Sequence, residues 1–370
     1  MGSVIPDIPG RPVERELEQQ LRQEVGKLLG ASPQRFPGAQ PISFGNEHLY
    51  QLEREDYFVC EKSDGVRCLI YMRINSQKQP ETFLIDRKNK YRLVRELKFP
   101  IPDDSTFTKF HHQTIIDGEI ILDKEDDGKI TPRFLAFDLL AIAGKAVIDK
   151  PFSKRLGYLR NHVCGPFNHM LKKDPNLSRF MPFTVEAKKM ERSYGLEMIL
   201  KVEVPKLKHE SDGLIFTGVD ADYHIGTCEK MLKWKPPNEN SIDFKLVVEP
   251  QGNGKPNFNL HVWKGGREYE FFAQLGLTDD EWIRFRNNRT KLDGRIVEVT
   301  YDETHLPPYK WKFLRFRDDK LHGNHNSVVE KIVKSIEDGV ESETLIEHCP
   351  AIRSAWKARE SARESKNKYN

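Results

Sequence analysis

The sequence predicts an α+β protein of two domains. Short apolar runs bounded by Gly, Asp and Asn, which are typical of strands, recur from residue 57 onward, while helical spacing dominates the two ends and residues 152–210. The length of 370 residues suits two domains, and a polar, proline-containing break at residues 236–240 separates two groups of strands. Hydrophobic residues make up 38% and charged residues 31%, which indicates a folded, soluble chain.

The first group of elements begins with an amphipathic helix over residues 13–29. We expect Gly30 to cap this helix, whose apolar stripe consists of Leu17, Leu21, Val25 and Leu28. Strands are then predicted at DYFVCEK, VRCLIYMRI, TFLIDRK, TIIDGEIIL and RFLAFDLLAI. Residues 152–210 contain helical pieces, and strands return at DGLIFTGV and MLKWKP.

The second group follows the break and contains five strand-like runs within about 80 residues. These runs are IDFKLVVE, FNLHVWK, REYEFFAQL, RIVEVTYD and KWKFLRFR. Five such strands suit a small barrel of the OB-fold type, and helical spacing resumes after them. We therefore expect a first domain at 1–240, an OB-fold domain at 241–325 and a helical segment at 326–370 that packs back on the first domain.

Several classes of protein are disfavoured. No apolar run approaches the roughly 18 residues of a membrane span, and the N-terminus lacks a signal-peptide pattern, so we expect an intracellular protein. The five cysteines are scattered without a C-x-x-C pair, which argues against disulfides and structural zinc, and we expect Cys60 and Cys68 in the core. The net charge of +3 leaves any attraction for nucleic acid to local clusters.

The chemistry centres on Lys62, in the sequence KSDGVR after an apolar strand. A lysine is a covalent nucleophile only when neutral, and burial or nearby cations lower its pKa. Gly65 permits close backbone approach, and Asp64 and Arg67 can anchor a polar ligand. A solvated turn explains this segment equally well when it is considered alone.

Two basic elements strengthen the hypothesis. In MLKWKP, period-two alternation puts Lys233 and Lys235 on one face of a strand, where two repelling ammonium groups suit a phosphate; an edge strand with solvated lysines is the alternative. In RFRDDK, Arg315 and Arg317 share a face, and forked guanidinium groups suit terminal phosphates. That segment alone is better explained as a surface charge run.

Two acidic elements, IIDGEI with Glu119 and SDGLIF with Asp212, complete the set. Glu119 is available for a ribose hydroxyl or a metal ion, although Asp-Gly before a strand is often only turn chemistry.

Taken together and in order, these elements resemble the covalent nucleotidyltransferase superfamily of capping enzymes and ATP-dependent ligases. The matching segments are EKSDGVR, FLIDRK, IIDGEI, FLAFDLL, SDGLIF, MLKWKP and RFRDDK. Within the superfamily the chain is similar to fungal mRNA guanylyltransferases. The resemblance implies an antiparallel nucleotidyltransferase domain followed by an OB-fold domain that closes over GTP.

The resemblance also implies a role for each matching residue. Lys62 would attack the α-phosphate of GTP and hold GMP as a phosphoramide while pyrophosphate leaves. Phe137 would stack on guanine, and Lys188, a looser match, would reach the guanine edge. The remaining nucleotide-binding residues would be Asp64, Arg67, Arg87, Glu119, Asp212, Lys233, Lys235, Asp243, Arg315, Arg317, Asp319 and Lys320.

Cofactors and partners are likewise implied by the resemblance. The expected metal is Mg²⁺ or Mn²⁺, with Glu119 and Asp243 as candidate ligands, and the acceptor is a 5′-diphosphate RNA. No H-C-x5-R motif of a fused triphosphatase occurs, so a separate RNA triphosphatase subunit is expected. A nuclear location and recruitment by the phosphorylated tail of RNA polymerase II are also implied, with a candidate phosphopeptide site at Lys150, Lys154 and Arg155.

Two other functions compete with this one. An ATP-dependent polynucleotide ligase would share Lys62 but use ATP, although the short interval between MLKWKP and RFRDDK leaves little room for parts that encircle a duplex. A non-catalytic adaptor with an OB-fold binding platform would not require Lys62. The nucleotide that labels the protein separates the three.

Overall fold

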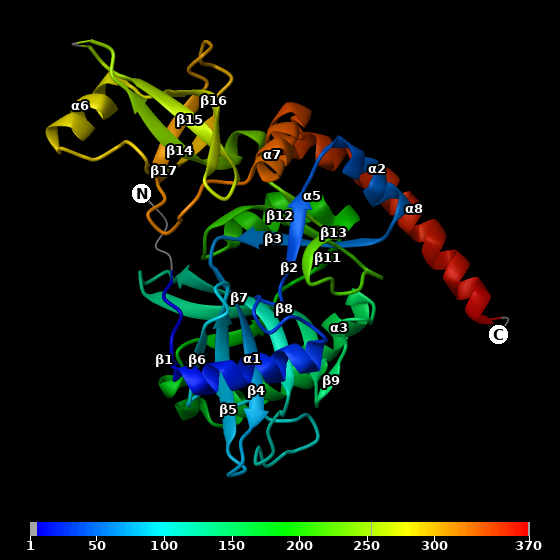
Figure 1. Cartoon of the computed structure of the whole chain (residues 1–370). Helices are drawn as coiled ribbons and strands as arrows, with labels where there is room; N and C mark the ends of the chain where they lie inside the picture. Colours follow the sequence, from blue (N-terminus) through cyan, green and yellow to red (C-terminus); the bar gives the residue numbers. More distant parts are fainter. Residues whose placement is uncertain (1–5, 253, 369–370) are drawn as a thin grey trace. The chain divides into compact units, whose positions relative to one another are not determined.

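The computed structural model describes residues 6–252 and 254–368, with side chains described as far as 365 (Figure 1). The chain forms two compact units, each discontinuous in sequence. The first consists of residues 1–42, 50–234 and 346–370, and the second of residues 43–49 and 235–345. No helix in the described part of the chain combines the length and apolarity needed to cross a bilayer.

The first unit contains two sheets. The larger has the order β1 (Arg11–Pro12), β6 (Tyr91–Leu93), β5 (Pro80–Asp86), β4 (Val66–Ile74), β7 (Thr114–Lys124), β8 (Ile130–Ile142) and β10 (Thr184–Ala187), with β9 (Lys145–Ala146) paired to β8. The smaller has the order β11 (Glu191–Arg192), β3 (Tyr57–Ser63), β12 (Ser211–Gly218), β13 (Gly226–Trp234) and β2 (Ala39–Ser43). All pairs except β8 with β10 are antiparallel in the larger sheet.

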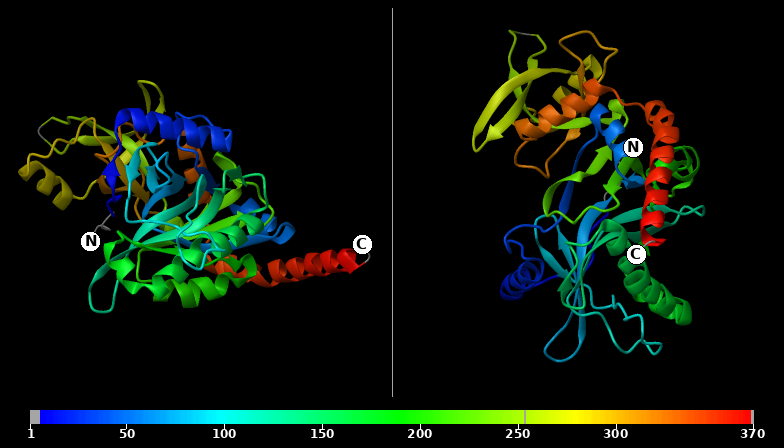
Figure 2. Two further views of the ribbon diagram at one scale, coloured as in Figure 1. Left: turned by 90° about the horizontal axis from the view of Figure 1, so that it is seen from below. Right: turned by 90° about the vertical axis from the view of Figure 1, so that its right-hand side faces the viewer.

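Helices cover both faces of the larger sheet. Helix α1 (Arg15–Leu29) packs Leu21 and Val25 against one face, and Gly30 ends it in the left-handed conformation, as predicted. Helices α3 (Phe152–Tyr158) and α4 (Gly165–Lys173), joined by the π-helical turn Leu159–Cys164, cover the other face (Figure 2). The short strands β10 and β11 lie within residues 152–210, the region predicted to be mixed helix, which contains α3, α4 and the single-turn helix α5 (Leu196–Met198).

The second unit is a closed barrel with the predicted five strands. Its order is β14 (Ser241–Glu249), β15 (Asn257–Gly265), β16 (Glu268–Gly276), β18 (Trp311–Phe316) and β17 (Ile296–Tyr301), which is the strand order of an OB-fold. Helix α6 (Asp279–Asn287) connects β16 to β17 and begins with a capping box between Thr278 and Glu281. Helix α7 (Asn326–Asp338) packs Val329 and Ile332 against the barrel core.

Two helices belong to both units. Helix α2 (Asn46–Arg54) and helix α8 (Ser342–Lys368) begin in the second unit and end in the first. In the first unit α8 buries Ile352 and Trp356, and Arg359 donates to the buried carboxylate of Asp56 at 2.8 Å. All five cysteines are buried, and no disulfide forms among the described residues.

Candidate active site

A cavity of about 130 Å³ lies between the two sheets of the first unit. Strands β3, β12 and β13 supply one side, and β4, β7 and β8 supply the other. Six residues singled out in the sequence therefore meet at one place: Lys62, Arg67, Arg87, Glu119, Phe137 and Lys188. Cys60 of β3 also lines this cavity. Burial raises the pKa of its thiol to about 12, which makes the thiol unreactive, in agreement with the prediction that Cys60 is a core residue.

Lys62 reaches the cavity from the end of β3. Its Nζ donates a hydrogen bond of 2.5 Å to Asp212 Oδ1 in the neighbouring strand β12, which pairs with β3 through an irregular register at this point. Gly65 forms the turn into β4, and a Cβ there would lie 2.3 Å from the carbonyl oxygen of Ile120. A side chain at this position would therefore force β4 and β7 apart beside the lysine.

Arg67 is buried in the opposite wall. Its guanidinium donates to both oxygens of Asp117, at 3.0 and 2.5 Å, and to the carbonyl of Ala39. Burial alone would lower the pKa of Arg67, but Asp117, Tyr223 and Glu119 together raise it above its usual value, so the ion pair persists. The guanidinium carbon lies 5.5 Å from the ring centroid of Phe137. Most N–H donors of Arg67 are therefore bonded to protein acceptors, and its guanidinium packs against the ring of Phe137.

Glu119 faces Arg67 in register across β4 and β7. Burial raises the pKa of Glu119, while Lys188, Lys62 and Arg87 act in the opposite direction. A carboxylate in these surroundings is stabilised by a hydroxyl donor or a metal ion. The carboxylate therefore fits a ribose hydroxyl or a divalent ion. Among the described residues, no group of three or more His, Cys, Asp or Glu side chains is placed to hold a metal without help from a ligand.

Lys188 is buried at the base of the cavity. Its Nζ donates to Ser63 Oγ at 2.5 Å and lies 3.1 Å from Glu61 Oε1. His209 continues this network, because its Nδ1 lies 2.8 Å from Asp123 Oδ1 and its Nε2 lies 3.6 Å from Glu61. Burial alone would lower the pKa of His209, but the two carboxylates raise it.

Three residues of the site were not predicted from the sequence: Asp117, Glu61 and His209. Asp117 carried a usable signal, since it is an acid within an otherwise apolar strand. The other two lie in partly polar stretches, where the same pattern indicates solvent exposure.

The two lysines of MLKWKP lie at the end of β13. Met231 lines the cavity, and alternation places Lys233 on the same face, in register with Ile215 of the cavity wall. Leu232 and Trp234 are buried on the other face, as predicted, and Lys235 follows directly after the strand. Asp64, in contrast, lies exposed in the turn, and the structure does not place it in the cavity wall.

A second cluster of predicted residues lies in the barrel unit. Asp243 is buried and accepts hydrogen bonds from Arg317, at 3.2 Å, and from Lys320. Arg317 also pairs with Asp319 at 3.0 Å and holds the pKa of that carboxyl at about 2. Arg315 donates to Glu298 at 2.6 Å, and Glu298 also lies 3.5 Å from Arg317, so the two arginines share a face, as expected. Asp243 thus serves here as the shared acceptor of two cations.

The prediction that Arg155 belongs to a phosphopeptide-binding cluster is wrong. The side chain is 1% exposed and forms a bidentate ion pair with Asp138, at 2.8 and 2.9 Å. It also donates to the carbonyl of Ala221 at 2.7 Å. A guanidinium buried in this way is inaccessible to a peptide phosphate, while Lys154 alone of the three is exposed. The sequence showed only a basic cluster, because Asp138 lies 17 residues away from Arg155, in strand β8.

Solved structures with some likeness to the chain are DNA ligases. Mycobacterial DNA ligase D with ATP matches with a TM-score of 0.37 and 16% identity over 76% of this chain and 94% of that chain. The ATP-dependent DNA ligase of bacteriophage T7 with ATP matches with a TM-score of 0.36 and 13% identity over 76% and 98%. Scores this low carry no weight for activity.

Sequence comparisons give much stronger evidence for the family of the chain than the solved structures do. Residues 5–237 match the family model for the mRNA capping enzyme catalytic domain, and residues 239–346 match that for the mRNA capping enzyme C-terminal domain. The mRNA-capping enzyme subunit alpha of Neurospora crassa is 40% identical over 96% of this chain and 94% of its own length. The protein of the same name from Schizosaccharomyces pombe is 38% identical over 98% and 92%. On these matches and the geometry of its cavity, the chain belongs to the mRNA capping enzyme family.

Proposed function

We propose that this protein is an mRNA guanylyltransferase that transfers GMP from GTP to the 5′-diphosphate end of RNA through Lys62. The observation that carries the proposal is the position of Lys62, which enters the cavity between the two sheets beside the aromatic ring of Phe137 and pairs with Asp212 at 2.5 Å. The family match over nearly the whole chain supports the same reaction.

The first half-reaction forms a bond between Lys62 Nζ and the α-phosphorus of GTP and breaks the bond to the bridging oxygen of pyrophosphate. The ammonium must first lose a proton, since only a neutral amine is nucleophilic. Asp212 Oδ1, which already accepts a hydrogen bond from this nitrogen, is the acceptor for that proton. In the second half-reaction a terminal phosphate oxygen of the RNA attacks the same phosphorus and the bond from Lys62 Nζ to phosphorus breaks. The departing nitrogen takes a proton back from Asp212, so that Lys62 leaves as the amine.

Binding of the nucleotide is assigned from the walls of the cavity. Phe137 offers a ring face to guanine, and Lys188, fixed by Ser63 and Glu61, offers a donor to the guanine edge. Arg87 and Glu119, which also line the cavity, are assigned to binding of the ribose. The α-phosphate is assigned to Lys233 and Lys235, and the β- and γ-phosphates to Arg315, Arg317, Asp319 and Lys320 of the barrel unit.

A divalent ion, Mg²⁺ or Mn²⁺, would be held by Glu119 together with phosphate oxygens. One carboxylate is enough, because Mg²⁺ in nucleotide sites is bound through one or two carboxylates and the substrate. When bound, the ion neutralises phosphate charge. Asp243 fits this role less well, since Arg317 and Lys320 already neutralise it.

The proposal extends to partners and location. The Neurospora crassa relative is named subunit alpha, and this supports a further subunit, for which an RNA 5′-triphosphatase has the required chemistry. Recruitment to the phosphorylated tail of RNA polymerase II, and hence a nuclear location, follows from the same proposal. Exposed Lys154 remains a candidate contact for that tail without Arg155.

The test is incubation of the purified protein with α-labelled GTP or α-labelled ATP and Mg²⁺ or Mn²⁺, followed by denaturation. We expect acid-labile, alkali-stable GMP label that Lys62→Ala abolishes and the exposed control Lys154→Ala retains. AMP label would instead identify a ligase, and no label from either nucleotide would favour a binding adaptor. Label that survives Lys62→Ala would move the nucleophile elsewhere.

A further inference from the structure

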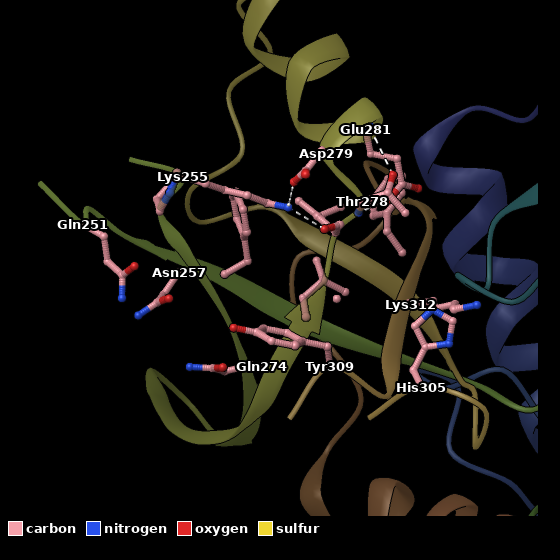
Figure 3. Close-up of a pocket in the computed structure, with 16 residues that line it drawn as sticks. Gln251, Lys255, Asn257, Gln274, Thr278, Asp279, Glu281, His305, Tyr309 and Lys312 are labelled. Carbon is pink, nitrogen blue, oxygen red and sulfur yellow. Dashed lines mark hydrogen bonds and ion pairs between the residues drawn. The ribbon is translucent and has the colours of Figure 1, made fainter. Parts of the chain in front are cut away.

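The barrel unit contains a larger cavity, of about 660 Å³. Its walls come from the β14–β15 connection, β15, the end of β16, the start of α6 and the β17–β18 connection (Figure 3). In the observed strand order β15 and β16 are strands 2 and 3 of the OB-fold. The cavity thus lies on the face, and between the two loops, that OB-folds use for single-stranded nucleic acids and oligosaccharides.

The polar groups at one end of this cavity are mainly amides. Gln251, Asn257 and Gln274 gather beside the ring of Tyr309, as Figure 3 shows. Their side chains make no hydrogen bond to any of the described residues, although each amide has donors and an acceptor. Such a set matches the donors and acceptors on base edges and on the ribose 2′-hydroxyl.

Tyr309 supplies an aromatic surface. The side chain is 50% exposed and its backbone packs directly over Gly276, where an added Cβ would lie 2.6 Å from the Tyr309 carbonyl oxygen. Glycine at the end of β16 therefore allows the β17–β18 connection to approach the strand. A half-exposed ring beside unpartnered amides suits the stacking of an unpaired base.

The cations of the cavity are already neutralised. Lys255 donates to Asp279 at 2.9 Å and to the carbonyl of Leu277 at 2.7 Å, and Lys312 pairs with Asp302. Recognition here depends on stacking and hydrogen bonds more than on backbone phosphates. In a duplex the base faces are stacked on one another and cannot contact Tyr309, so the cavity suits unpaired nucleotides.

We propose that this cavity binds one or two unpaired nucleotides of the acceptor RNA. The identity of the ligand as RNA rests on the proposed function, because a guanylyltransferase must hold a single-stranded 5′ end. The volume suits this ligand, since small-molecule sites occupy about 300–1,000 Å³.

The test uses the full chain and a 3′-fluorescent, ten-nucleotide, single-stranded RNA with a 5′-hydroxyl, which binds but cannot accept GMP. We expect Tyr309→Ala to weaken binding by roughly 5- to 150-fold, the range measured for loss of one base–aromatic stack. Gln274→Glu, which keeps the size of the side chain but removes the amide N–H donors, should also weaken binding. The matched control is Phe180→Ala, which removes a 72% exposed ring from the first unit. The dependence on salt should be shallow, with a log–log slope smaller in magnitude than about 1.5, equivalent to two phosphate contacts.

Labelling of Lys62 with GMP, measured on the same preparations, should be unchanged in both pocket variants. If it is, and both variants bind RNA like the parent protein, the RNA site is refuted. Binding of a phosphorylated peptide through Tyr309, with no RNA binding, would also refute it. If the parent binds RNA through Tyr309 but accepts no GMP, the proposed function fails and the RNA site stands.

Discussion

Replacing Arg155 with Met should sharply destabilise the first unit. Arg155 and Asp138 are each 1% exposed and share two hydrogen bonds. The substitution keeps an apolar stem of similar length but leaves the carboxylate buried with only the backbone N–H of Leu139, at 2.7 Å, as a remaining donor. Burial already raises the pKa of Asp138, and loss of the guanidinium removes the main opposing cause.

The expected cost follows from this geometry. Removing one partner of a buried ion pair costs about 3–5 kcal/mol. For a unit of this size each kcal/mol lowers the melting temperature by about 2–4 °C, so the decrease should be roughly 6–20 °C. The assay is thermal denaturation followed by calorimetry.

Two further variants make the result specific. Lys154→Met changes an exposed neighbour and should shift the melting temperature by less than about 2 °C. The double variant Arg155→Met with Asp138→Leu should melt above the single variant, because no unpaired charge remains. If Arg155→Met melts within about 2 °C of the parent, the ion pair does not stabilise the fold in the way described.

Three other predictions concern the site. Phe137→Ala should raise the dissociation constant for GTP more than it slows RNA transfer, and unchanged GTP affinity would exclude stacking. Lys320→Ala should slow formation of the Lys62–GMP intermediate yet spare transfer from preformed intermediate, because its proposed ligand leaves with pyrophosphate; equal loss in both steps would remove that role. The folded-state pKa of His209 is raised, so its stabilising contribution is complete below about pH 6.5 and declines as the pH rises through the folded value. The melting-temperature difference between parent and His209→Gln should therefore be larger at pH 6 than at pH 8.5, and an equal difference would contradict the assignment.

Local patterns were sufficient to predict most of the architecture. The barrel strands alternate or carry continuous apolar runs, and each ends at turn residues, so five strands and an OB-fold were predictable. Residues of the cavity were also predictable where they stand in ordered motifs, as Lys62 and Glu119 do.

The rest depends on contacts between distant parts of the chain. Arg67 pairs with Asp117 at a sequence separation of 50 residues, and Lys188 donates a hydrogen bond to Ser63 at a separation of 125 residues. Neither pairing leaves a trace in local periodicity. The strand β10, with four residues, is too short for alternation to distinguish it from the helical pieces around it.

The path of the chain through α2 and α8 has a practical consequence for fragments. A fragment ending at the polar break near residue 236 would contain every motif of the cavity but lack α8. The apolar surface on which Ile352 and Trp356 pack would then be exposed to water, and the buried carboxylate of Asp56 would lose its hydrogen bond from Arg359. Such a fragment should aggregate or misfold, and it would also lack the barrel residues Arg315, Arg317 and Lys320 that are assigned to the β- and γ-phosphates. GMP labelling must therefore be measured on the full chain or on two fragments produced together. A negative result from the N-terminal piece alone would reflect its folding and its missing phosphate ligands, and would not test the role of Lys62.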